Sequence, residues 1–182
     1  MDRVQPSTTH PWLVVESEIS DLLHRIDIRE FESVVREFDG LDGRWFFSGQ
    51  GRSGLVAKMV AMRFMHLGRR AHVPGEATAP SIRKGDGLVL VSGSGETRVS
   101  VLFAEIAKSE GARVVVVTHE PQSALAGLGD VVLTIPARDS RQLGGSLFEQ
   151  AALLVLDAVV LAISGEQTAA RTTLAYLHTN FQ

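Results

Sequence analysis

The chain has 182 residues, of which 45% are hydrophobic and 21% are charged, and its formal net charge is −3. This length supports one substantial core and falls short of two ordinary domains, so we expect a single domain over residues 1–182. The slightly acidic charge predicts no general attraction to nucleic acid or to anionic membranes. The chain contains no cysteine, which excludes disulfides and thiolate metal sites and favours a reducing, cytoplasmic location.

Neither a signal peptide nor a membrane-spanning segment is predicted. The first twelve residues, MDRVQPSTTHPW, lack the apolar run that a signal peptide contains. The apolar stretch from Ala151 to Ile163 includes Asp157 and is too short to span a bilayer. We therefore expect a protein without a membrane partner.

The first part of the chain predicts a polar arm followed by helices. Residues 1–11 are polar and contain two prolines, which is typical of a loose arm. Residues 12–39 carry apolar side chains near helical spacing, so we expect one or two helices there. Residues 40–43 then turn the chain into a short strand at 44–47.

The remainder of the chain alternates between short apolar strands and helices. Strands made of continuous β-branched runs, alternating with helices, indicate a parallel sheet that is covered on both faces. The predicted fold class is therefore α/β: a three-layer α/β/α sandwich with a five-stranded parallel sheet, similar to flavodoxin and Rossmann folds. After the first strand we expect helices at 53–67, near Pro80, and at 97–109, 123–128, 146–164 and 166–178, with strands at 71–73, 87–91, 113–117 and 131–135.

Glycine-rich loops follow two of the predicted strands. The sequence SGQGRSG at 48–54 follows the first strand, and SGSGET at 92–97 follows the strand at 87–91. Glycines let backbone N–H groups turn inward, hydroxyls add donors, and the next helix N-terminus adds positive potential, a combination that suits a phosphate. Parallel strands end at one edge of their sheet, which is where α/β proteins bind ligands. We expect both loops at that edge.

Two other interpretations of these loops stay open on the residues alone. The first loop satisfies G-x-G-x-x-G, and Glu76 lies at the distance where a dinucleotide-binding protein places its ribose-binding acid. However, the chain leaves little room for a separate catalytic domain, and a dinucleotide gives the second loop no role. Alternatively, the glycines only make tight turns and the hydroxyl residues cap helices. The three hydroxyls of the second loop exceed what capping one helix requires.

The second loop and several further segments resemble sugar isomerase (SIS) domains and, within that class, the 6-phospho-3-hexuloisomerase family. The tail LHTNFQ at 177–182 and the sequence GEATAP at 75–80 are similar to the family's segments but depart from them. The resemblance covers about residues 44–163 and is carried by 51–58, 61–63 with 65–68, 75–76 with Thr78 and Pro80, 92–97, and 145–150 with 156–158.

The resemblance implies an enzyme that interconverts D-arabino-hex-3-ulose 6-phosphate and D-fructose 6-phosphate through an enediolate. It implies no cofactor and no metal, a phosphosugar as substrate, and a homodimer or homotetramer whose subunits share active sites. The residues that it places in the site are Gly51, Arg52, Ser53, Ser92, Ser94 and Thr97 for substrate and phosphate binding, and Glu149 and His178 for catalysis.

The two implied catalytic residues have ordinary structural interpretations as well. Ser146 and Glu149 form an S-x-x-E pattern before an apolar helix, which predicts a capping box. The residues alone favour capping, whereas the resemblance favours a general base that moves a proton between adjacent carbons. His178 alone would be a solvated tail residue, whereas the resemblance implies a proton shuttle in a neighbouring subunit's site. His119, which follows the strand at 113–117, is a further candidate at the ligand-binding edge.

Two alternative functions remain, together with a prediction about assembly. Another SIS phosphosugar isomerase would share the loops and the base, and the departures at 75–80 and in the tail leave the sugar open. A non-catalytic phosphosugar sensor would need only the loops, although the acidic charge and the lack of a recognisable helix-turn-helix before residue 44 argue against it. The helix at 147–163 is apolar nearly all round, which predicts burial on more than one side and therefore a homo-oligomer.

Overall fold

The computed structural model describes residues 10–165 and 167–180, so nearly all of the predicted arm at 1–11 lies outside the described residues. The elements in chain order are α1 (Pro11–Leu23), α2 (Ile28–Gly40), β1 (Trp45–Gly49), α3 (Gly51–His66), β2 (Ala71–His72), β3 (Gly87–Val91), α4 (Arg98–Ser109), β4 (Arg113–Thr118), α5 (Ala124–Leu128), β5 (Val131–Thr134), α6 (Ser146–Ile163) and α7 (Gln167–Leu177).

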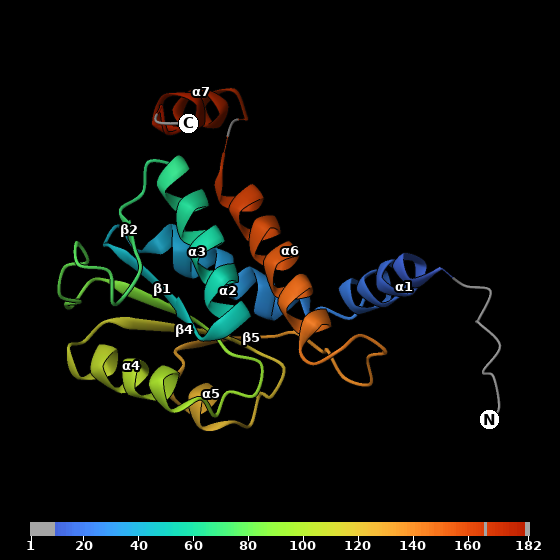
Figure 1. Cartoon of the computed structure of the whole chain (residues 1–182). Coiled ribbons are helices and arrows are strands. Elements are labelled where there is room, and N and C mark those ends of the chain that lie inside the picture. The colour runs from blue at the N-terminus through green and yellow to red at the C-terminus, as the bar shows by residue number, and fades with distance from the viewer. Residues whose placement is uncertain (1–9, 166, 181–182) are drawn as a thin grey trace, which may run out of the picture.

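The five strands form one parallel sheet in the order β2-β1-β3-β4-β5. Helices α4 and α5 cover one face, and α2, α3 and α6 cover the other (Figure 1). Helix α1 packs against α6, and α7 lies beyond the end of α3 (Figure 1). The predicted three-layer sandwich with a five-stranded parallel sheet is confirmed.

Alternate side chains of each central strand enter two separate hydrophobic cores. In β3, Val89 and Val91 belong to the core beneath α2, α3 and α6, whereas Leu88 and Leu90 belong to the core beneath α4 and α5. This alternation is the period-two geometry of a strand. Because both faces are covered, the strand appears in the sequence as a continuous apolar run.

The predicted short helix near Pro80 is wrong. Residues 74–78 form turns and a bend, and residues 79–80 have no regular secondary structure. Pro74 and Pro80 have no backbone N–H to donate, and Gly75 has a φ of 92°, which lies outside the helical region. The N-terminal residues form two helices, because the Asp27 carboxylate caps α2 by accepting from the backbone N–H of Arg29 at 2.7 Å.

Within the described ranges, one helix, α6, is long and apolar enough to cross a membrane by length and composition alone. Its mean hydropathy is 1.9, and 39% of it is buried inside the protein. Phe148, Ala151, Val155 and Val159 belong to the core that α6 shares with α2 and α3. One face of α6 therefore belongs to the core.

Asp86 ties together the starts of the two strands that carry the glycine loops. Its carboxylate accepts from the Arg44 backbone N–H at 3.0 Å, from the Arg44 guanidinium at 3.1 and 2.7 Å, and from the Arg83 backbone N–H at 2.9 Å. The Asp86 side chain is only 7% exposed. Burial opposes its ionisation, but the hydrogen bonds from Arg44 and Arg83 outweigh burial and lower the pKa of Asp86.

Replacing Asp86 with asparagine should lower the free energy of unfolding by about 2–3 kcal/mol at neutral pH, because a buried guanidinium pair is broken. A carboxyl whose pKa is lowered by folding stabilises the protein above its unfolded pKa, and this contribution is lost as the pH falls through the folded pKa. In urea unfolding, the difference between wild type and Asp86→Asn should therefore shrink as the pH is lowered below the unfolded value of 3.8.

The matched control is Glu110→Gln, which removes the exposed ion pair that Glu110 makes with Arg83 at 2.7 Å. Exposed pairs contribute little, so this change should cost less than about 1 kcal/mol. Equal losses in the two variants would contradict the anchoring role of Asp86.

Candidate active site

The two glycine-rich loops meet where the strand order reverses. Strands β1 and β3 are neighbours, but the chain leaves β1 toward β2 and leaves β3 toward β4, so their carboxyl ends frame a crevice of the kind in which α/β sheets bind ligands. A Cβ added at Gly49 would lie 2.7 Å from the Val91 carbonyl oxygen. The first loop therefore rests directly on the end of β3, and the expected meeting of the loops is confirmed.

The glycines of the first loop are explained by close packing between β1 and α3. A Cβ on Gly54 would lie 2.7 Å from the Gly49 carbonyl oxygen, so this strand and helix approach as only glycine allows. Ser53 is buried in the first turn of α3, whereas Arg52 is 62% exposed. Glu76, the acid of the dinucleotide interpretation, pairs instead with Lys58 at 3.8 Å.

The second loop is braced from the neighbouring strand and helix. The Gly93 carbonyl accepts from the Thr118 hydroxyl at 2.8 Å and from the His119 N–H at 3.2 Å. The carboxylate of Glu96 accepts from the backbone N–H of Ala124, at the start of α5, at 2.8 Å. Gly95 has a φ of 64°, and any Cβ there would overlap the Ser123 hydroxyl. These contacts hold the loop in shape.

The hydroxyls of the second loop are not used to cap α4. Thr97 occupies the N-cap position, but its side chain makes no capping hydrogen bond. The Ser92 hydroxyl lies 3.4 Å from that of Thr97, and the Ser94 hydroxyl accepts a 3.3 Å bond from the Glu96 N–H. The capping interpretation of this loop is therefore wrong, and the hydroxyls of Ser92 and Thr97 face each other across the loop.

Glu149 does not form the predicted capping box. The N-cap residue of α6 is Gly145, which makes no side-chain cap, and the Ser146 hydroxyl donates to the Leu143 carbonyl at 2.8 Å. The Glu149 side chain is 15% exposed, and its carboxylate accepts a hydrogen bond from Nε of Arg52. The capping box is wrong because Glu149 reaches across to α3.

The first turn of α6 lies against the second loop. A Cβ on Gly93 would lie 3.4 Å from both Phe148 and His119. The His119 ring packs edge-on to Phe148, with ring centroids 6.0 Å apart, and its Nδ1 is buried without a partner among the described residues. The structure thus brings the second loop, the Arg52–Glu149 pair and His119 together at one edge of the sheet.

His178 lies elsewhere in its own chain. Its ring stacks on His66, with centroids 5.5 Å apart and an interplanar angle of 10°. Burial is the main cause that lowers the pKa of His66, and the nearby Arg63 adds to it. His66 ends α3, whose first turn carries Arg52, and a helix of 16 residues is about 24 Å long. One chain alone does not bring His178 to Glu149.

Sequence reasoning missed three contributors to the site. The contact of Arg52 with Glu149 joins residues 97 positions apart, and no local pattern indicates it. Phe148 looks like any other apolar residue of α6. Glu96 lies within the loop motif, but its hydrogen bond to the backbone at the start of α5 is not indicated by that motif. The only signal for this contact is that an acidic side chain is favourable near a helix N-terminus.

A cavity of about 270 Å³ opens beside the first loop. Val73, Pro74 and Gly75 form part of its wall. Its polar lining comes from Ser48, Gln50, Lys58 and Glu76. Gly75 and Glu76, which begin the segment 75–80, therefore border open space beside the first loop.

The fold is that of a doubly wound α/β protein, and two glycine-rich loops lie together where its strand order reverses. The sequence matches the SIS domain over residues 42–162. It is 44% identical over 154 residues to 3-hexulose-6-phosphate isomerase of Mycobacterium gastri, covering 80% of this chain and 77% of that protein. The chain belongs to the SIS-domain family, and the resemblance to SIS sugar isomerases is confirmed.

Two further similarities agree with this family. The chain is 37% identical over 146 residues to 3-hexulose-6-phosphate isomerase of Bacillus subtilis, covering 75% of this chain and 79% of that protein. A crystal structure of a hypothetical protein from Methanococcus jannaschii, for which the function of 3-hexulose-6-phosphate isomerase was inferred, matches with a TM-score of 0.82. That match has 28% identity and covers 94% of this chain and 98% of the other.

Proposed function

We propose that this protein is a 6-phospho-3-hexuloisomerase, which interconverts D-arabino-hex-3-ulose 6-phosphate and D-fructose 6-phosphate. The names of its relatives support this substrate pair. The observation that carries the proposal is the placement of Glu149, a mostly buried carboxylate, beside a braced loop whose hydroxyls do not cap its helix. The absence of cysteine fits an enzyme of the cytoplasm.

The phosphate of the substrate binds in the second loop. Its oxygens accept hydrogen bonds from the hydroxyls of Ser92, Ser94 and Thr97 and from backbone N–H groups at the start of α4, where the helix dipole favours an anion. Ser53 and the backbone at Gly51 line the same crevice from the first loop. This end of the substrate is held while the chemistry takes place at the carbons near the carbonyl.

Glu149 moves the proton. From fructose 6-phosphate its carboxylate takes the proton on C3, which leaves a 2,3-enediolate. It then delivers to C2 either that proton or one that has exchanged with solvent. One hydroxyl proton must also pass from O3 to O2, so that the carbonyl moves from C2 to C3. A carboxylate near both carbons completes the transfer with no net change of protons.

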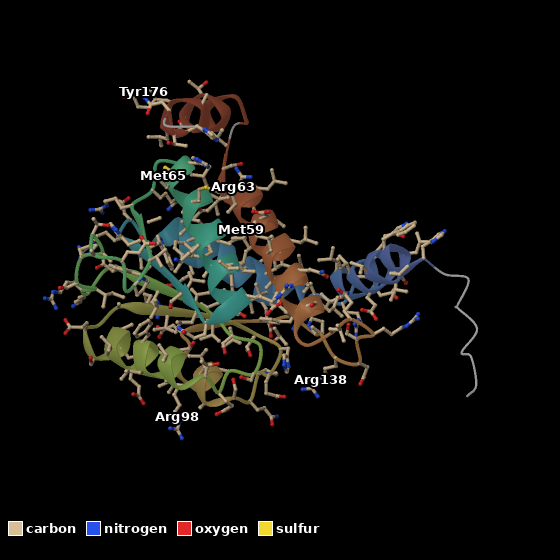
Figure 2. The ribbon with its side chains drawn as sticks, viewed as in Figure 1. Met59, Arg63, Met65, Arg98, Arg138 and Tyr176 are labelled. Atoms are coloured by element: carbon tan, nitrogen blue, oxygen red, sulfur yellow. The ribbon has the colours of Figure 1, made fainter. Side chains whose placement is uncertain are left out.

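His178 of a second subunit carries the proton between the two oxygens. This role supposes a homo-oligomer, which the surface of one chain supports. Leu55, Met59 and Met62 on α3 and Leu161 on α6 are exposed. Figure 2 shows Met59 on α3 next to α6. Burying this apolar face against a second copy would remove it from water.

The direct experiment is an assay of the purified protein against a panel of ketose and aldose phosphates. We expect D-arabino-hex-3-ulose 6-phosphate to give fructose 6-phosphate, detected by coupling to glucose-6-phosphate isomerase and glucose-6-phosphate dehydrogenase. A faster reaction with another phosphosugar would keep the isomerase class and replace the substrate. In that case the lining of the 270 Å³ cavity is the first place to seek the difference.

A further inference from the structure

The candidate site contains an ion pair between its proposed base, Glu149, and Arg52. Arg52, in the first turn of α3, donates from Nε to the carboxylate of Glu149, in the first turn of α6. Among the described residues, Glu149 is the sole partner of the Arg52 side chain. The pair therefore joins the first turns of α3 and α6 across the site.

The ion pair between Arg52 and Glu149 would hinder proton abstraction by the Glu149 carboxylate. A carboxylate that accepts a charge-assisted hydrogen bond has one of its oxygens occupied and its negative charge partly compensated. An oxygen that is held by Arg52 cannot at the same time accept a proton from a substrate carbon. Any group that takes Arg52 away from Glu149 would free that oxygen for the reaction.

The substrate brings a group of that kind. A phosphate carries more charge than a carboxylate and offers several oxygens to a guanidinium, for which phosphate is a preferred partner. Arg52 is accessible to such a group, because its side chain is 62% exposed. The second loop is close by, since Phe148, the residue before Glu149, packs against Gly93 of that loop.

We propose that Arg52 is a latch, which holds the carboxylate of Glu149 in the empty enzyme and exchanges it for the substrate phosphate. This inference rests on the proposed function of Glu149 as the base. Phosphate binding then releases the base only when a phosphorylated sugar occupies the site. Unphosphorylated sugars leave the latch closed, so Arg52 becomes a positioning residue that sets specificity as well as affinity.

The latch is tested by a double-mutant cycle in which the affinity for inorganic phosphate is measured. This measurement does not depend on catalytic activity. Dissociation constants are measured by calorimetry for wild type, Glu149→Gln, Arg52→Gln and the double variant. In wild type, phosphate must first break the Arg52–Glu149 pair. We compare the effect of Glu149→Gln on phosphate affinity in two backgrounds, one with Arg52 and one with Arg52→Gln. The gain in affinity should be about two- to fivefold larger in the background with Arg52, as expected for one largely exposed ion pair.

The binding cycle distinguishes the latch from simple electrostatic repulsion between the Glu149 carboxylate and phosphate. If Glu149 only repels phosphate through its charge, its removal tightens binding equally in both backgrounds, and the latch is overturned. Weaker binding by Glu149→Gln than by wild type overturns it as well. Arg63→Gln is the matched control, because Arg63 lies at the α7 end of the same helix (Figure 2) and its loss should leave phosphate affinity unchanged. Thermal melting of each variant verifies that it is folded.

The same variants distinguish failure of the latch from failure of the proposed function. If Glu149→Gln has lost isomerisation and the cycle shows no coupling, Glu149 is the base and the latch is wrong. If Glu149→Gln isomerises as fast as wild type, the proposed function of Glu149 is wrong and the latch, which rests on it, is rejected too. Arg52→Lys keeps the charge, so it should restore part of the coupling that Arg52→Gln removes.

Discussion

Glu149→Gln is expected to lower kcat for fructose 6-phosphate by about 10³-fold, with phosphosugar binding retained. The amide keeps the size of the side chain and cannot accept a proton from carbon, and general bases contribute about 10²- to 10⁴-fold. Loss of the base lowers kcat, whereas KM should stay the same or fall a few-fold, because the change also frees Arg52 for the phosphate. Steady-state kinetics, with binding measured by calorimetry, separate these two quantities.

The control for this variant is Glu105→Gln, an exposed glutamate in the middle of α4. It changes the net charge by the same amount and should leave kcat unaltered. A Glu149→Gln enzyme with more than a tenth of wild-type kcat would reject Glu149 as the base. Parallel loss of phosphosugar binding would mean that Glu149 supports the site and does not move the proton.

The second large effect is expected when two inactive variants are mixed. His178→Gln alone should lose about 10²-fold in kcat, because the proton shuttle between O2 and O3 is removed. Suppose that each active site combines Glu149 of one subunit with His178 of its neighbour. A hybrid of a Glu149→Gln subunit and a His178→Gln subunit then has one site with both residues intact and one site with neither. Random mixing should then restore about a quarter of wild-type activity in the unseparated mixture and about half in purified hybrid dimers.

Co-expression with two different affinity tags, followed by sequential purification, isolates the hybrids. Native mass spectrometry verifies their subunit composition. Hybrids that form and remain inactive would contradict the shared site and confine His178 to its own chain, where it stacks on His66. Co-purified wild type carrying the same two tags sets the reference activity.

The sheet and the position of the ligand site follow from local patterns. Runs such as GLVLV at 87–91 are buried on both faces, so they are apolar throughout and easy to assign. Each glycine loop comes directly after such a run. Because parallel strands end at a common edge, the meeting of both loops at the β1–β3 reversal could be predicted without knowing any side-chain contact.

The side-chain geometry of the site could not be predicted in the same way. The S-x-x-E pattern at Ser146 and Glu149 predicts a local cap, but Arg52 competes for the same carboxylate from a different helix. Which first-turn residues of α3 and α6 face each other depends on how the two helices pack. The capping prediction failed at the residue that the family resemblance places in catalysis, where local rules are expected to yield to function.

The N-terminal segments illustrate the same limit. Residues 12–39 carry helical periodicity throughout, and the break between α1 and α2 depends on the cap that Asp27 provides. The segment at 74–80 lacks any periodicity, and Pro74 and Gly75 lie in turns. Turn chemistry of this kind is present in the sequence, but a short helix and a series of turns share many of the same residues.

Exchange of substrate protons with heavy water tests the central claim most directly. The wild-type protein is incubated with fructose 6-phosphate in deuterium oxide, and the C3 proton is followed by NMR. We predict loss of the C3 signal by enzyme-catalysed exchange through the 2,3-enediolate, and no loss with Glu149→Gln. Saturable binding of fructose 6-phosphate by the wild-type protein, with the C3 proton fully retained, would contradict this account and favour a phosphosugar sensor.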